Sequence, residues 1–167
     1  LGSAYELASA ATNNQPDARA LSLTAADFDA DGYPDLISGY AVGEGGLLSV
    51  NRGNREAWAP TLALSQALIR AGQYPSGFLA DAVSLQLPVA PELITSGDFD
   101  HDGHADLVLA QRGDSAIYLM RGGAQGLGAP QKLAQAGGVD ALAAGNIDRP
   151  DGFADLAVAV SGKTGAS

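Results

Sequence analysis

A short aspartate-rich motif occurs twice in this chain and limits what the chain can fold into. One copy reads Asp-Phe-Asp-Ala-Asp-Gly-Tyr-Pro-Asp-Leu over residues 27–36, and the other reads Asp-Phe-Asp-His-Asp-Gly-His-Ala-Asp-Leu over residues 98–107. Both place aspartate at positions one, three, five and nine and glycine at position six. A looser copy over residues 146–156 begins with asparagine and has one extra residue before its glycine. Three copies indicate a repeat protein.

The motif predicts a calcium site. Four carboxylates this close repel one another unless a cation neutralises them, and calcium accepts six to eight oxygen ligands in irregular geometry. The glycine at position six permits the tight turn that returns position nine to the ion. The predicted ligands are Asp27, Asp29, Asp31, Asp35 and the Tyr33 carbonyl in the first loop, Asp98, Asp100, Asp102, Asp106 and the His104 carbonyl in the second, and Asn146, Asp148, Asp151, Asp155 and the Phe153 carbonyl in the third. The third loop has three carboxylates rather than four, so we expect weaker binding there.

Two other interpretations compete with the calcium site. An EF-hand loop requires a bidentate acid at position twelve, where this chain has Ser38 and Leu109. The EF-hand is therefore excluded. The second alternative is a solvated acidic turn that binds no ion. Each further copy of the motif makes this alternative less probable.

Charge and composition narrow the classes of partner. The net charge is −10, and the three loops contain four, four and three of the 19 acidic residues. This charge argues against binding to nucleic acid or to an anionic membrane surface. No apolar run approaches the ~18 residues of a membrane span, so we expect no membrane insertion. Cysteine is absent, which excludes disulfides. The chain begins at Leu1 without an initiator methionine, so we expect a processed product or an excised piece.

Apolar segments on each side of the loops predict an antiparallel, all-β fold. The predicted strands are 20–28, 36–42, 47–51, 82–87, 92–99, 107–111, 116–120, 131–136, 139–147 and 156–160, with one more at Tyr5–Ala11. A helix is predicted over 61–71, between Pro60 and Gly72. Its apolar residues lie near one face, and Trp58 is placed to pack at its entry. The segment is interpreted as a packing insertion without chemistry, and a binding site on it is the alternative.

The repeat extends beyond the loop. The dipeptides Arg52-Gly53 and Arg121-Gly122 follow the first two loops at similar distances. The first and second loops begin 71 residues apart, and the second and third begin 48 residues apart. The helical insertion accounts for the difference. A unit of 48 residues is close to the size of one four-stranded propeller blade.

These loops, the apolar strand on each side and the Arg-Gly turn resemble FG-GAP/VCBS-type repeats, which also form the integrin α-subunit propeller. The resemblance implies that each repeat is a blade and that its loop binds calcium between the first two strands. The expected fold is a partial β-propeller of about two four-stranded blades and part of a third, with a helical insertion near 61–71. The expected units are 1–17 (outer strand of a preceding or neighbouring blade), 18–90, 91–137 and 138–167 (incomplete).

The predicted function is a calcium-binding β-propeller module with a binding or scaffold role and structural ions, located outside the cytoplasm (extracellular, periplasmic or at the cell surface). No catalytic motif occurs, so no enzymatic activity is expected. His101 and His104 are interpreted as exposed loop residues. Propellers close with roughly four to eight blades. The expected partners are therefore the rest of a longer propeller chain or further copies of this one, with a protein or a glycan as ligand. The alternatives are a non-catalytic propeller part of a carbohydrate-active enzyme and a homo-oligomer that completes the ring in trans.

Overall fold

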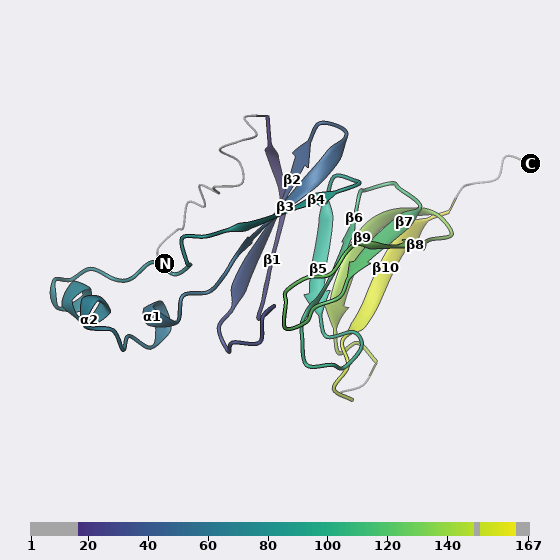
Figure 1. The fold of residues 1–167 in the computed structure, drawn as a ribbon. Helices are drawn as coiled ribbons and strands as arrows, with labels where there is room; N and C mark the ends of the chain where they lie inside the picture. Colours follow the sequence, from purple (N-terminus) through teal and green to yellow (C-terminus); the bar gives the residue numbers. More distant parts are fainter. Residues whose placement is uncertain (1–16, 149–150, 163–167) are drawn as a thin grey trace, which may run out of the picture.

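The computed structural model describes residues 17–148 and 151–162. This part of the chain contains ten β-strands in three antiparallel sheets and two short α-helices (Figure 1). The all-β fold class is therefore confirmed. The strand predicted at Tyr5–Ala11 lies outside the described residues.

Each of the first two sheets contains four strands in sequence order. The first sheet consists of β1 (Arg19–Ala26), β2 (Asp35–Val42), β3 (Gly45–Asn51) and β4 (Val83–Leu87). The second consists of β5 (Leu93–Gly97), β6 (Asp106–Ala110), β7 (Ala116–Met120) and β8 (Gln131–Ala134). The third pairs β9 (Gly138–Gly145) with β10 (Asp155–Ser161). The predicted strands within the described residues are confirmed, with small shifts at their ends.

The strand register is the same around each acidic loop. In the first two loops the ninth residue of the motif begins the second strand and lies opposite the last residue of the first strand: Ala26 opposite Asp35, and Gly97 opposite Asp106. In the third loop, which has one extra residue, the equivalent Asp155 lies opposite Gly145. The motif therefore closes three equivalent hairpins, β1–β2, β5–β6 and β9–β10.

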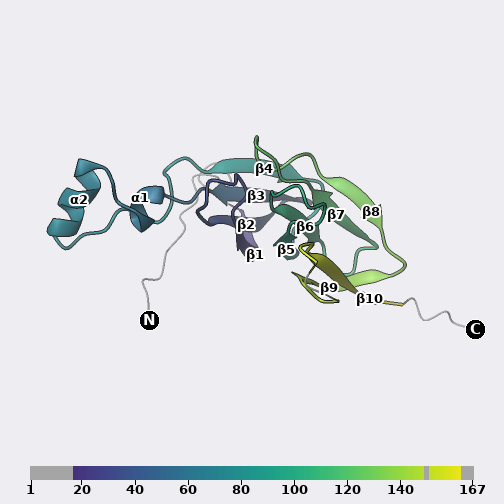
Figure 2. The ribbon, with the colours of Figure 1, turned by 90° about the horizontal axis from the view of Figure 1, so that it is seen from below.

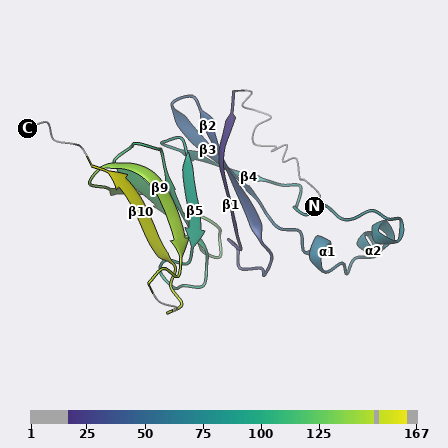
Figure 3. The ribbon, with the colours of Figure 1, turned by 180° about the vertical axis from the view of Figure 1, so that it is seen from behind.

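The sheets pack face to face, with β1, β5 and β9 side by side (Figures 1 and 3). One apolar cluster joins the first and second sheets and includes Ile37, Leu48, Leu107 and Leu109, which have no exposed surface. A second cluster joins the second and third sheets through Val108, Ala110, Ile117 and Val139. Both faces of β6 are therefore buried, and this explains its continuous apolar sequence.

The insertion between β3 and β4 contains α1 (Arg55–Trp58) and α2 (Ala63–Arg70). The helix predicted at 61–71 is confirmed, whereas α1 was not predicted. The interpretation of this segment as a packing insertion is wrong. The insertion projects away from the sheets (Figures 1 and 2), and Trp58, Leu62 and Leu64 are 64%, 60% and 72% exposed.

The insertion leaves and rejoins the first sheet at one point, which explains why it can project. The Leu79 N–H donates to the Arg52 carbonyl at 2.9 Å, and the Asn54 N–H donates to the Gly77 carbonyl at 2.9 Å. Its two ends are thus held together beside β3. No helix in the described part of the chain is both long enough and apolar enough to cross a membrane.

The three sheets described do not close into a ring (Figure 2). The number of blades and the division at 18–90, 91–137 and 138–167 therefore stay predictions.

Candidate metal centre

The three acidic loops lie at the same end of the sheet stack, where β1, β5 and β9 end (Figure 1). The first two loops have the same backbone shape. Position four is left-handed in both, with φ of 56° at Ala30 and 61° at His101. Position six is left-handed as well, with φ of 88° at Gly32 and Gly103. Glycine adopts this conformation without steric cost, which is the reason for its place in the motif.

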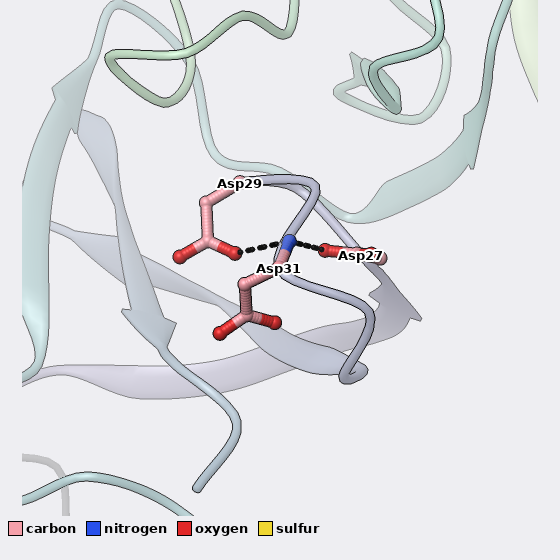
Figure 4. Close-up of side chains that lie close together, drawn as sticks. All are labelled: Asp27, Asp29 and Asp31. Atoms are coloured by element: carbon pink, nitrogen blue, oxygen red, sulfur yellow. Dashed lines mark hydrogen bonds between the residues drawn. The ribbon is translucent and has the colours of Figure 1, made fainter. Parts of the chain in front are cut away.

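The aspartate at position one fastens the turn. The Asp27 carboxylate accepts hydrogen bonds from the N–H of Asp31 (3.1 Å, Figure 4) and of Gly32 (2.8 Å). Asp98 makes the same pair of bonds with Asp102 (3.2 Å) and Gly103 (3.0 Å). Both oxygens of the first carboxylate are thereby directed into the loop.

The fifth position makes a smaller turn of the same kind in both copies. Asp31 accepts from the Tyr33 N–H at 2.9 Å, and Asp102 accepts from the His104 N–H at 2.9 Å. These bonds are local, so the two loops reach the same shape independently.

The aspartate at position nine connects the loop to the sheet. Asp35, at 1% exposed, accepts from the N–H of Phe28 (3.0 Å) and of Gly53 (2.8 Å). Asp106, with no exposed surface, accepts from the N–H of Phe99 (3.1 Å) and of Gly122 (2.8 Å). Each ninth carboxylate thus ties position two of its loop to the glycine that follows the third strand.

Burial raises the pKa of Asp35 above its ordinary value of 3.8. The two backbone N–H donors oppose this shift, and the nearby charges of Asp29 and Asp31 add to it. The ninth carboxylate is held in the fold although its charge is poorly solvated.

The aspartate at position three pairs with an arginine from outside the loop. Arg52 Nε donates to Asp29 Oδ2 at 2.6 Å, and the two side chains form a salt bridge. Arg121 forms the corresponding salt bridge with Asp100. Both arginines immediately precede the glycine that binds the ninth carboxylate. The Arg-Gly dipeptide therefore contacts two aspartates of each loop.

The structure brings three carboxylates together in each of the first two loops. One oxygen each from Asp27, Asp29 and Asp31 lies within 4.8 Å of the others (Figure 4). In the second loop the same is true of Asp98, Asp100 and Asp106. Ligands at the roughly 2.3–2.6 Å typical of calcium lie no farther apart than twice that distance. The donor set, which is all oxygen, therefore fits a calcium ion.

The two groups do not coincide with the full predicted sets. Asp35 lies outside the first group, and Asp102 lies outside the second. The carbonyl ligands predicted at Tyr33, His104 and Phe153 stay predictions.

The third loop is described except for residues 149–150. Its ninth-position equivalent, Asp155, accepts from the N–H of Ile147 (2.8 Å) and of Asp148 (3.2 Å), and Asp151 accepts from the Phe153 N–H (3.1 Å). No group of three close acids forms in its described residues. The ligand roles of Asn146, Asp148, Asp151 and Asp155 stay predictions.

The second and third loops are in contact. The Ala154 N–H donates to the Asp98 carbonyl at 3.0 Å, and His101 Nδ1 lies 3.0 Å from the Gly152 carbonyl oxygen. The His101 ring also lies 4.5 Å from the Phe153 ring, centroid to centroid. His101 is exposed, as predicted. His104 is only half-buried, because its Cβ lies against Gly122, so its prediction as an exposed residue is corrected.

Comparison with known proteins finds a likeness for part of the chain. Residues 98–162, which run from the second loop to the end of β10, match the family model of the FG-GAP-like repeat. This segment is similar to the FG-GAP-like repeat. No curated protein and no solved structure matches the chain. The first loop lies outside the matched segment and shares the sequence pattern and backbone shape of the second.

The acidic loops make contacts that were not predicted from the sequence. The Arg-Gly dipeptide was identified as part of the repeat unit, but its two bonds to the loop were not predicted. Its recurrence 25 residues after Asp27 and 23 residues after Asp98 was the available signal. The contact of His101 with the third loop had no such signal, because Ala30 occupies the same position in the first loop.

Proposed function

We propose that the chain is a calcium-binding β-propeller module with a non-catalytic binding or scaffold role. One observation carries the proposal: two loops of the same shape each gather three carboxylate oxygens within 4.8 Å. Asp27, Asp29 and Asp31 would hold one ion, and Asp98, Asp100 and Asp106 a second. The third loop is proposed as a weaker site.

The proposed ions are structural. A bound calcium would neutralise the repulsion among the acids and attach the loop to the two strands that it joins. Because an unfolded chain does not preform such a site, the free energy of binding adds to the free energy of folding. The family match over residues 98–162 supports a propeller-type module.

The proposed location is outside the cytoplasm: extracellular, periplasmic or at the cell surface. Calcium sites in extracellular modules bind with Kd of about 10⁻⁴–10⁻³ M. Sites this weak are occupied only where calcium is abundant. Of the six clustered aspartates, two are exposed, three are half-buried and one is buried. Local turns rather than a closed cage hold them, which fits this class.

The proposed partners are the rest of a longer propeller chain or a second copy of this chain. Within the described residues, β10 is hydrogen-bonded to β9 alone, whereas the equivalent strands β2 and β6 are paired on both sides. An unpaired strand edge favours a further strand beside it. Which protein or glycan such a module binds depends on surfaces beyond these hairpins.

Isothermal titration with calcium tests the proposal. The wild-type chain is expected to bind two ions, and a third more weakly, in the range given above. The double variant D98N/D100N should lose one of the two stronger sites, and D27N/D29N should lose the other. Asp81→Asn is the matched control, because Asp81 is exposed and lies outside the loops. No binding by the wild-type chain, or equal loss in the control, would contradict the proposal.

A further inference from the structure

The arginines that follow the third strands are the only side chains outside the loops described here as forming salt bridges with the clustered acids. Arg52 and Arg121 come from different sheets and from equivalent positions in the repeat. Each contacts the aspartate at position three of its loop. Two independent copies of one contact indicate a role within the repeat rather than a chance surface pair.

We propose that Arg52 and Arg121 are positioning residues that act as built-in counter-cations of the acidic loops. In the absence of calcium, each guanidinium offsets part of the repulsion among the carboxylates and holds the aspartate at position three in place. The same positive charge lowers the affinity of the loop for calcium. The second statement rests on the proposed calcium function; the first does not.

The geometry of the first loop shows how the arginine and a cation share one carboxylate. Arg52 Nε binds Asp29 Oδ2, whereas Asp29 Oδ1 faces the loop and lies 3.3 Å from the Asp31 N–H (Figure 4). The arginine therefore takes the outer oxygen and leaves the inner one directed at the other acids. Asp29, at position three, would thus offer one oxygen to an ion.

Partial burial of the aspartates strengthens their electrostatic interaction with the arginines. The side chains of Asp29 and Asp100 are 17% and 28% exposed, whereas those of Arg52 and Arg121 are 48% and 56% exposed. The carboxylates are partly removed from water, so a nearby cation compensates for lost solvation. The arginines remain largely in solvent, so the interaction weakens as the salt concentration rises.

The glycine beside each arginine fixes its position. The N–H groups of Gly53 and Gly122 donate to the aspartates at position nine. These bonds place the preceding arginine next to the loop. A Cβ on Gly53 would lie 2.7 Å from the Pro34 carbonyl oxygen, so no larger residue fits there. The Arg-Gly dipeptide thereby combines a backbone bond to position nine with an ion pair to position three.

The test compares the double variant R52Q/R121Q with Arg70→Gln. Gln retains polarity and removes the charge. Arg70 lies on the projecting helix α2, so its variant removes a positive charge far from the loops. In EDTA at low salt, the melting temperature of R52Q/R121Q is expected to lie about 2–4 °C below that of wild type. Arg70→Gln should have the melting temperature of wild type. The drop should shrink at high salt, and R52K/R121K should recover most of it.

Calcium titration provides the second readout. Removing one positive charge beside a divalent site is expected to tighten binding by about threefold per loop at moderate salt. Arg70→Gln should bind as wild type does. A wild-type chain that binds no calcium would contradict the proposed function. Equal melting of R52Q/R121Q and wild type in EDTA would overturn the counter-cation role. Unchanged or weaker calcium binding by R52Q/R121Q would overturn the effect on affinity.

Discussion

At the scale of single residues, the four aspartates of one loop have different tasks. The aspartate at position one fastens the turn through two loop N–H groups. The aspartate at position three pairs with an arginine, and the one at position five makes a short local turn. The ninth is buried and accepts two backbone hydrogen bonds. Aspartate at four positions therefore forms the carboxylate cluster, sets the loop shape and attaches the loop to the sheet.

The ninth aspartate should contribute to stability without any ion. Asp106→Ala removes a fully buried carboxylate and leaves the part-buried N–H groups of Phe99 and Gly122 without their acceptor. Leaving a buried donor unsatisfied costs about 1–3 kcal/mol, so we expect a loss of roughly 3 kcal/mol in the free energy of unfolding. Urea unfolding in EDTA measures this loss. Asp81→Ala, at an exposed site, is the control, and equal effects in the two variants would refute the role.

The positions of the loops could be predicted from the sequence because the residues that determine the turn are close together in the chain. The spacing of the acids and the glycine sets the turn, and the apolar runs beside them set the strands. The separate role of Asp35 was not predicted, because it depends on Gly53, which lies 18 residues away. The ligand groups differ from the predicted sets for a related reason: which oxygens converge depends on side-chain orientation, which spacing alone does not determine.

At the scale of elements, the insertion between β3 and β4 differs from the rest of the repeat. Helical periodicity predicted α2 correctly, but an amphipathic pattern gives no information on whether a partner surface is present. Leu62 and Leu64 are exposed in the described part of the chain. The carboxylate of Glu56 holds the start of this helix: it accepts hydrogen bonds from the N–H groups of Thr61 and Leu62, both at 2.9 Å.

This interaction just before α2 should titrate in acid. Hydrogen bonds from Leu62 and Thr61 lower the pKa of Glu56 from 4.5 to about 2. Because the folded pKa is depressed, the stabilisation is present above pH 4.5 and is lost as the pH falls towards 2. The carboxyl carbon resonance of Glu56 followed by NMR gives the pKa directly. A midpoint near 4.5 would show that the helix start is held in another way.

The insertion should be removable. Its two ends meet through hydrogen bonds between Asn54 and Gly77 and between Leu79 and Arg52, and Ser65 is the one buried residue of α1 and α2. Replacing residues 55–76 with a two-residue Asn-Gly turn should therefore leave the two apolar clusters intact. We expect a change in melting temperature of no more than about 2–4 °C and unchanged calcium binding. A collapse of cooperative unfolding would show that the insertion supports the sheets.

At the scale of the whole molecule, equivalent hairpins are stacked side by side with their acidic loops at one end (Figure 1). The excess negative charge is gathered in these loops, so like charges meet on one side of the stack. The repeat length predicted four-stranded units, and the structure has two such sheets. The blade count was beyond the reach of the sequence, because closure depends on how many sheets associate.

The central claim is that a divalent ion among the clustered aspartates stabilises these hairpins. Thermal unfolding of the full chain in millimolar calcium and in EDTA tests it most directly, with magnesium as the control for general charge screening. We expect a clearly higher melting temperature in calcium than in either other condition. A variant that carries Asp→Asn changes at positions 27, 29, 98 and 100 should lose most of this difference. Equal melting temperatures in calcium and EDTA would contradict the claim.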